Sequence, residues 1–417
     1  MPGGGATAGP ATRARLTERH VLALGLALSG AFMAAAILVA AISAISGGPT
    51  WAAIHLALAG AATTAIGAFM PHFAITLSGT RPEPAVQRLI GLGLLAGGAA
   101  AAVAGMTLLG GAWAAAGSVA VIAGLGLTAW QTVAPLRSPL SRRHPIVTAC
   151  YLVALAQLAI GVAIGGLAGA GSDVVTDAWA TLRPAHAWLT LLGAVSLTIF
   201  GTLVYLAPTI LGARIRASAA LMTATTGMVL GPLVGATGFA AGSAPLAIAG
   251  AGVTLIGAVG QVGYVADTIR RRGPYTSEHD WRRVAVWHMA AGTGWFAAAI
   301  AVATVELVAG HPVVAWSLGL LAVPLIGGWM LQELVSSWTH LAPSVTPGDP
   351  AAHAAQRRVL AVASRARPVA WNLGVAGLWV GLAIGVVPLA AAGGVVLAAV
   401  TIASVALLLK ALTIGRY

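Results

Sequence analysis

Twelve long apolar stretches fill this chain of 417 residues and leave room for little except membrane-spanning helices. Only 8% of the residues are charged, whereas a soluble domain carries about 25%. The stretches lack the alternation that strands need, and a helix satisfies its own backbone hydrogen bonds in hydrocarbon. The sequence therefore predicts an all-α polytopic membrane protein of twelve transmembrane helices. The predicted spans are 21–46, 51–78, 89–110, 112–135, 146–170, 184–212, 218–241, 244–266, 286–309, 312–339, 368–388 and 390–414.

The basic residues lie in alternate loops between these spans. Of the 22 Lys and Arg residues, only Arg183 falls in the opposite set of loops. Basic loops face the cytoplasm, so this pattern predicts that both termini are cytoplasmic. It also explains the net charge of +12 without a nucleic-acid partner, because the basic side chains serve as topology signals and contacts for lipid headgroups.

Composition also limits the domain organisation and the metal chemistry. Residues 1–19 are rich in Gly, Pro and Ala, and we expect a disordered cytoplasmic tail followed by one transmembrane domain over 20–417. No cleavable signal peptide is evident. Cys150 is the only cysteine, which excludes an internal disulfide and any CxxC motif. A metal would therefore need His, Met, Tyr or carboxylate ligands.

An internal repeat is indicated by the second, sixth and tenth spans, which end alike. Each has a proline, then a glycine, then a basic loop, and Pro71, Pro208 and Pro343 are 137 and 135 residues apart. Proline removes a helical hydrogen bond, so we expect it to mark the cytoplasmic end of each helix. The spacing predicts a pseudo-threefold 4+4+4 arrangement, and repeats of this kind often frame a binding site. The repeats are expected at about 20–135, 144–268 and 286–414.

Three histidines, His55, His186 and His311, lie near the outer ends of the same three spans. Neutral imidazole is a common ligand of haem iron and copper. These histidines precede their prolines by 16, 22 and 32 residues. In straight helices their depths would then differ by roughly 9 Å and 15 Å, so they need not meet at one ion and could serve separate sites. The alternative is a hydrogen bond to a neighbouring helix, and His311 could equally be interfacial.

Small and charged residues near the first two histidines suggest what they could bind. Glycines follow both, and we expect them to let a flat macrocycle approach the helix; they are Gly60, Gly67, Gly193 and Gly201. Arg183 lies one turn before His186 and would neutralise a haem propionate, unless the two form an interfacial pair. Glu333 and His340 share a helix face and are expected to pair or to pass protons.

Two segments carry a resemblance to known proteins. HLALAGAATTAIGAFMPHFAITLSGTRP, at 55–82, and PAHAWLTLLGAVSLTIFGTLVYLAPTILG, at 184–212, resemble the NnrS-like haem- and copper-binding membrane proteins of bacteria. The layout of the whole chain resembles the catalytic subunit of the heme–copper oxidase superfamily. The resemblance implies that His55 is a low-spin haem ligand and that His186 occupies a copper position. It leaves His311 as the only haem-ligand candidate of the tenth span.

The chain also departs from the oxidases. The seventh span contains no histidine, Thr190 stands four residues after His186 where the oxidases have a tyrosine, and Val313 interrupts a His-x-His pair. We therefore expect noncovalent haem b, with or without one copper, and a sensing, protective or electron-transfer role with an unidentified redox partner. Oxygen reduction is not expected, and whether the protein is an enzyme stays open. The expected location is the bacterial plasma membrane. The alternatives are a secondary transporter of twelve spans and a structural subunit without a cofactor.

Overall fold

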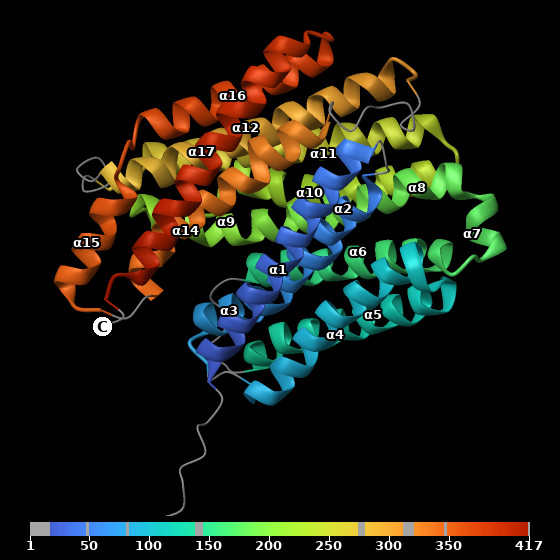
Figure 1. The fold of residues 1–417 in the computed structure, drawn as a ribbon, viewed down its shortest axis with the longest axis horizontal. Helices are drawn as coiled ribbons and strands as arrows, with labels where there is room; N and C mark the ends of the chain where they lie inside the picture. The colour runs from blue at the N-terminus through green and yellow to red at the C-terminus, as the bar shows by residue number, and fades with distance from the viewer. Residues whose placement is uncertain are drawn as a thin grey trace, which may run out of the picture. The chain divides into compact units, whose positions relative to one another are not determined.

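The computed structural model describes residues 17–46, 50–80, 83–137, 145–273, 280–311, 321–345 and 348–415 (Figure 1). These residues form helices and connecting turns, with no strand among them. Ten of the described helices are long and apolar enough to cross a membrane. The expectation of an all-α, polytopic membrane protein is thus confirmed at that level.

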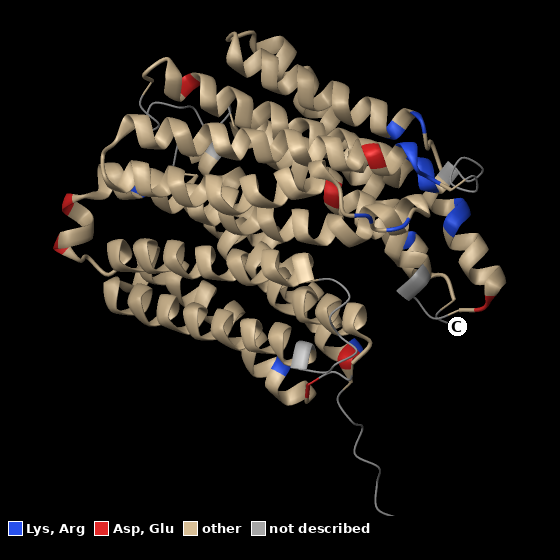
Figure 2. Cartoon of the chain, turned by 180° about the vertical axis from the view of Figure 1, so that it is seen from behind, with Lys and Arg blue, Asp and Glu red and all other residues tan. Residues whose placement is uncertain are grey.

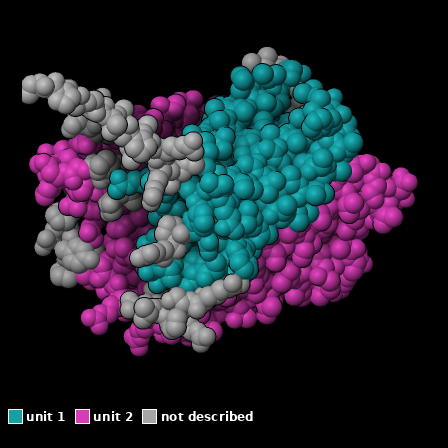
Figure 3. All heavy atoms as spheres, turned by 90° about the horizontal axis from the view of Figure 1, so that it is seen from below, with its two compact units in different colours: residues 1–144 teal, residues 145–417 magenta. Residues whose placement is uncertain are grey.

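The chain divides into two compact units, residues 1–144 and residues 145–417, which are coloured separately in Figure 3. The helices of unit 1 are α1 (Glu18–Ser46), α2 (Trp51–His55), η1 (Leu56–Ala62), α3 (Thr63–Ser78), α4 (Ala85–Ala104), η2 (Gly105–Leu109), α5 (Gly111–Val133) and η3 (Ala134–Arg137). Those of unit 2 are α6 (Pro145–Gly169), α7 (Asp173–Asp177), α8 (Trp179–Ala187), η5 (Trp188–Val195), α9 (Ser196–Leu211), α10 (Ala219–Ala240), α11 (Ala244–Arg270), α12 (Asp280–Val308), η8 (Val323–Met330), α14 (Leu331–Val345), α15 (Pro350–Leu360), α16 (Ala366–Ala383) and α17 (Val387–Thr413).

Two of the twelve predicted spans match the described helices only in part. The span predicted at 312–339 corresponds to η8 and α14, but residues 312–320 lie outside the described part of the chain. The span predicted at 368–388 corresponds to α16, which ends earlier, at Ala383. Neither is among the ten membrane-length apolar helices found in the described residues.

Basic residues are concentrated at one end of unit 2. Most of its Lys and Arg residues lie where α11 ends, α12 and α16 begin and α15 lies (Figure 2). Asp267 and Asp349 lie at the same end, and Arg183 lies elsewhere, on α8. The acidic helix α7, with Asp173 and Asp177, lies at the opposite end of this unit (Figure 2). This separation is what a membrane-spanning bundle with one basic face requires.

Close helix pairs are built on small residues. The pairs α4–α5, α10–α11 and α16–α17 each pack along their length. A Cβ added at Gly98 would lie 2.8 Å from the carbonyl oxygen of Gly117, and one at Gly374 would lie 2.8 Å from the amide nitrogen of Leu397. Side chains at these positions would therefore push the backbones apart, as expected where van der Waals packing holds membrane helices together.

Among the described residues, a π-helical segment interrupts three of the membrane helices, and a fourth, η2, continues α4 to Leu109. α2 passes into η1 and then α3, α8 passes into η5 and then α9, and η8 precedes α14. The three interrupting segments, η1, η5 and η8, pack against the long helix that comes before each of them in the chain, namely α1, α6 and α12, whereas η2 packs against α5. A π-helical turn is uncommon and is frequently found at functional sites.

The three repeated prolines do not end their helices as expected. Pro71 lies inside α3, which continues to Ser78, and Pro208 and Pro343 lie inside α9 and α14. A transmembrane helix tolerates proline where neighbouring groups compensate for the lost hydrogen bond. The actual stops of α3 and α9 are Gly79 and Gly212, which adopt the left-handed conformation with φ of 64° and 60°.

Candidate functional site

His55 ends α2, directly before the π segment η1. Its Nδ1 lies 2.9 Å from the carbonyl oxygen of Trp51, and its ring stacks on the Trp51 ring with centroids 4.1 Å apart. Because a carbonyl can only accept, Nδ1 must carry the proton, and the lone pair of the neutral imidazole is on Nε2. This is the tautomer that a metal-ligating histidine adopts when its other nitrogen donates to a backbone carbonyl.

His186 lies in the last turn of α8, two residues before the π segment η5. Its Nδ1 lies 2.8 Å from the carbonyl oxygen of Gly161 on α6, which fixes the same tautomer. Gly165, one turn further along α6, makes room for the ring, since a Cβ there would lie 2.9 Å from the imidazole Cε1. The glycines of α6 thus seat the imidazole against a neighbouring helix.

His311 and Arg183 occupy more exposed positions. His311 follows the end of α12, its side chain is 61% exposed, and its Nδ1 lies 2.6 Å from Glu306 Oε2. This contact corresponds to the interfacial alternative for His311. Arg183 is exposed on α8, one turn before His186. Its expected role beside a haem propionate remains a prediction.

The four glycines expected to open space for a macrocycle have a different role. A Cβ at Gly60 would meet the Phe32 ring, with 2.6 Å to its Cγ, and one at Gly193 would lie 2.8 Å from the Gln157 carboxamide carbon. The side chain of Leu95 covers Gly67, and Cys150 and Tyr151 cover Gly201. The expectation of open faces at these glycines was therefore wrong, because neighbouring helices already fill them.

No group of three or more His, Cys, Asp and Glu side chains is placed to hold a metal ion within the described residues. His55 belongs to unit 1, whereas His186 and His311 belong to unit 2. The donor set therefore consists of single imidazoles. Single histidines suit axial ligation of haem better than a copper centre built from several protein ligands.

Sequence reasoning missed a buried polar network between α12, α14 and α16. The His288 side chain is fully buried, and its Nδ1 lies 2.8 Å from Gln332 Oε1. The Gln332 amide nitrogen donates to the carbonyl oxygen of Gly328, at 2.7 Å, and to Asn372 Oδ1, at 3.2 Å. Since both amide protons are used, the Gln332 oxygen must accept from His288. His288 therefore carries its proton on Nδ1.

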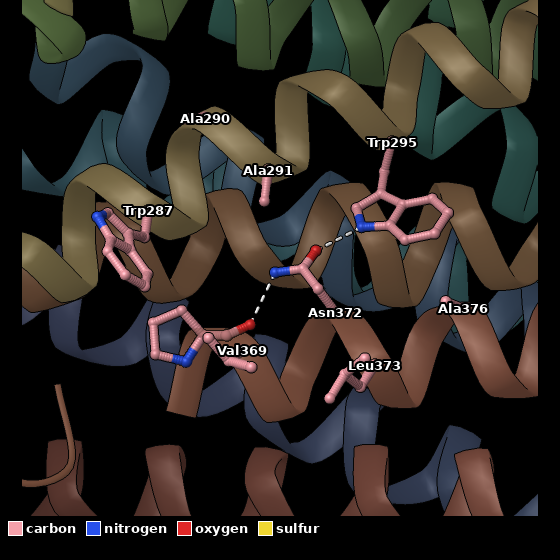
Figure 4. Close-up of a pocket in the computed structure, with 9 residues that line it drawn as sticks. Trp287, Ala290, Ala291, Trp295, Val369, Asn372, Leu373 and Ala376 are labelled. Atoms are coloured by element: carbon pink, nitrogen blue, oxygen red, sulfur yellow. Dashed lines mark hydrogen bonds between the residues drawn. The ribbon is translucent and has the colours of Figure 1, made fainter. Parts of the chain in front are cut away.

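The network ends at a groove on one side of α12 and α16. Asn372 Oδ1 accepts a hydrogen bond of 2.6 Å from the Trp295 indole, and its amide nitrogen donates to the carbonyl oxygen of Pro368, at 2.7 Å (Figure 4). The groove beside them has a volume of about 700 Å³ and is lined chiefly by Trp287, Ala290, Leu373 and other apolar side chains. Asn372, the one side-chain amide in this lining, thus hydrogen-bonds to protein groups through both its oxygen and its nitrogen.

Glu333 is also buried, and it does not pair with His340 as one sequence interpretation held. Its Oε1 lies 3.1 Å from Thr293 Oγ1 on α12, whereas His340 stacks on Trp281 with ring centroids 6.2 Å apart. Seven residues of helix separate the two by about 10 Å, too far for direct contact between them here. The polar residues within the apolar ninth, tenth and eleventh spans were the sequence signal from which this cluster could have been found.

These features define a class of protein, a polytopic helical membrane protein with oriented, partly buried histidines and a buried polar cluster in unit 2. Comparison with known proteins narrows the class no further. No protein-family model matches the chain, and no curated protein matches its sequence.

Proposed function

We propose that the chain spans a bacterial plasma membrane twelve times, in three sets of four helices with both termini cytoplasmic. Each set would contain a long helix, a second helix with a π segment, and a close hairpin: α4–α5, α10–α11 or α16–α17. The recurrence of the π segment against the preceding helix supports this arrangement. Reporter fusions at residues 140 and 275 should report cytoplasm and one at 175 the outside. A cytoplasmic signal at 175 would overturn the topology.

Within this fold, the proposed function is noncovalent binding of haem b, with His55 and His186 as axial ligands at separate places. The supporting observation is that both imidazoles donate from Nδ1 to a backbone carbonyl, so each has its lone pair on Nε2. The fit is incomplete, because the glycine faces beside both histidines are filled and His311 is engaged by Glu306. A bound haem would supply a redox-active, gas-binding iron. The exposed Arg183 would hold a propionate.

The proposed role is sensing, protection or electron transfer with an unidentified redox partner. Attachment would be noncovalent, since the one cysteine, Cys150, is buried and no CxxC exists. Thr190 donates its hydroxyl proton to the carbonyl oxygen of His186, at 2.9 Å. This side chain is therefore hydrogen-bonded to the backbone of its own helix. Alternatively, His186 would bind one copper ion. Metal analysis of the same sample would detect it.

The test is an absorption spectrum of purified protein after expression with ample haem, with a pyridine haemochrome assay. We expect a Soret band in the wild type and a reduced haem content in His55→Ala and in His186→Ala. The matched control is His311→Ala, which should retain the band. A colourless wild type would overturn haem binding, and unchanged spectra in both variants would overturn the ligand assignment.

Secondary transport is the second candidate, and one observation favours it. Ionisable groups inside membrane helices are costly and often mark ion or substrate pathways, and Glu333 and His288 are both buried in unit 2. Proteoliposomes under a pH gradient would test it. Solute-dependent proton movement through the wild-type protein would favour transport over haem binding.

A further inference from the structure

Glu333 stands apart from the other described acidic residues. Its side chain lies between α14 and α12 and is 3% exposed, and it is the only acidic residue in the buried set of the described chain. Gly292 on α12 provides the space, because a Cβ there would lie 3.0 Å from Glu333 Oε1. The fold therefore accommodates a carboxyl group at a position inside a membrane-spanning bundle.

The hydrogen bonds around this carboxyl indicate where its proton resides. Thr293 Oγ1 lies 2.8 Å from the carbonyl oxygen of Met289 and 3.1 Å from Glu333 Oε1. A hydroxyl has one proton, so Thr293 cannot donate to the Met289 carbonyl and to Glu333 at once. A protonated Glu333 carboxyl satisfies both contacts, because it can donate to the Thr293 oxygen while Thr293 donates to Met289. A carboxylate would have to compete with the Met289 carbonyl for the single hydroxyl proton.

The surroundings offer no compensating charge. Glu333 Oε2 has no hydrogen-bond partner among the described residues, and no described basic side chain forms an ion pair with this carboxyl. The described histidines and charged side chains on the helices around it are His288, Arg282, Arg283 and Glu306 on α12, His340 on α14 itself, His353, Arg357 and Arg358 on α15, Arg367 on α16 and Lys410 on α17. Arg282 and Arg357 stack against Trp281, at the basic end of the bundle. An ionised Glu333 would thus be an uncompensated buried charge.

His288 is a buried base whose orientation the network fixes. Its Nδ1 carries the proton donated to Gln332, and its Nε2 has no hydrogen-bond partner among the described residues. Thr293, which contacts Glu333, lies five residues after His288 on α12, a rise of about 7.5 Å. A bridging water would be needed to cover that separation, and two such polar atoms are suitable partners for one.

We propose that Glu333 is a proton-binding site within the membrane-spanning bundle and that His288 is the base that exchanges this proton. In the exchange, the O–H bond of the Glu333 carboxyl breaks and an N–H bond forms at His288 Nε2. The products are a carboxylate and an imidazolium, so the net charge of the cluster is unchanged. The site uses α12, α14 and α16 and does not rest on haem binding at His55 or His186.

Infrared spectroscopy of the full chain in lipid at neutral pH tests the site. A carboxylic acid has a carbonyl stretching band that a carboxylate lacks. We expect this band in the wild type and in the control Glu306→Gln, and its loss in Glu333→Gln. Thr293→Val should shift the band to higher frequency, because the carboxyl loses its hydrogen-bond partner. Absence of the band in the wild type, or its persistence in Glu333→Gln, would overturn the site.

The role of His288 has its own readout, the rate at which the Glu333 band shifts after transfer to D₂O. His288→Gln keeps a polar side chain near Gln332 but removes the base. We expect the band to remain and its deuterium shift to slow at least about tenfold. An unchanged rate would contradict the role of His288 while leaving Glu333 as the proton site. Neither result depends on the haem content of the sample, so failure here and failure of haem binding are distinguishable.

Discussion

The histidines beside the π segments and His288 in the polar network of α12, α14 and α16 are all held in one orientation, but by different kinds of contact. The Nδ1 tautomer of His55 and that of His186 are each fixed by a backbone carbonyl. His288 is oriented by Gln332, which is itself held by Asn372 and the Gly328 carbonyl. A backbone anchor of the first kind fixes the tautomer of one ring. A chain of side-chain contacts fixes the tautomer and the position of the helices together, so we expect stability to depend most on the network.

The largest effect is therefore expected from Asn372→Leu. The change removes the partner of the Trp295 indole, of one Gln332 proton and of the Pro368 carbonyl. Three lost hydrogen bonds, at about 1 kcal/mol each, should lower the free energy of unfolding by about 3 kcal/mol. Denaturant titration in detergent measures this. The control is Leu373→Ala at an exposed neighbouring position. A loss equal to that of the control would show that the network contributes nothing.

The Gly165→Ala variant tests whether α6 positions the His186 ring. The new Cβ would lie 2.9 Å from the imidazole Cε1, so the ring must move away from α6. Overpacking of this kind should cost about 1–2 kcal/mol and should weaken any ligand held by His186. Gly252→Ala is the control, because a Cβ there meets nothing within 4 Å. Equal thermal stabilities of the two variants would contradict the seating of His186 on α6.

Trp51→Leu should have a smaller effect at His55. The stacked ring is lost, but the hydrogen bond to the backbone carbonyl of residue 51 does not require the indole. We expect a loss of about 1 kcal/mol in stability, with haem content less affected than by His55→Ala. Thermal unfolding and haem assay on the same preparations report both quantities. A complete loss of haem would mean that stacking, and not the carbonyl contact, orients the ring.

The smallest effect is expected from Glu306→Gln. The His311–Glu306 pair is largely exposed on the histidine side, and exposed ion pairs contribute about 0–1 kcal/mol. Stability should change by less than about 1 kcal/mol, and the small difference should shrink further as salt is added. A large loss, or a change in the haem spectrum, would place His311 in the functional site after all.

Much of the fold could be predicted from the sequence, because apolar length and the placement of arginines are strong one-dimensional signals. Trp51–Ser78 and Gly111–Val133 agree with predicted spans to within a few residues. The π segments could not be predicted, since they depend on packing against α1, α6 and α12. The structural roles of Gly60 and Gly193 could not be predicted either, because a small residue leaves space equally for a cofactor and for a neighbouring helix.

The site was less accessible to sequence reasoning. His55 and His186 were found because a histidine in an apolar span is rare. Gln332 and Asn372 were passed over because single polar residues in spans carry no periodic signal. Their importance follows from contacts between residues 40 or more positions apart in the chain. Only the packing of α12, α14 and α16 brings these side chains together.

His55 and His186 are proposed to present oriented imidazoles to haem. The most direct test is titration of purified, haem-depleted protein with haem, followed by Soret absorbance, in the wild type and in the His55→Ala/His186→Ala double variant. His311→Ala serves as the matched control. We expect saturable binding in the wild type and the control and none above background in the double variant. Saturable binding of equal affinity and stoichiometry in the double variant would contradict haem ligation by His55 and His186.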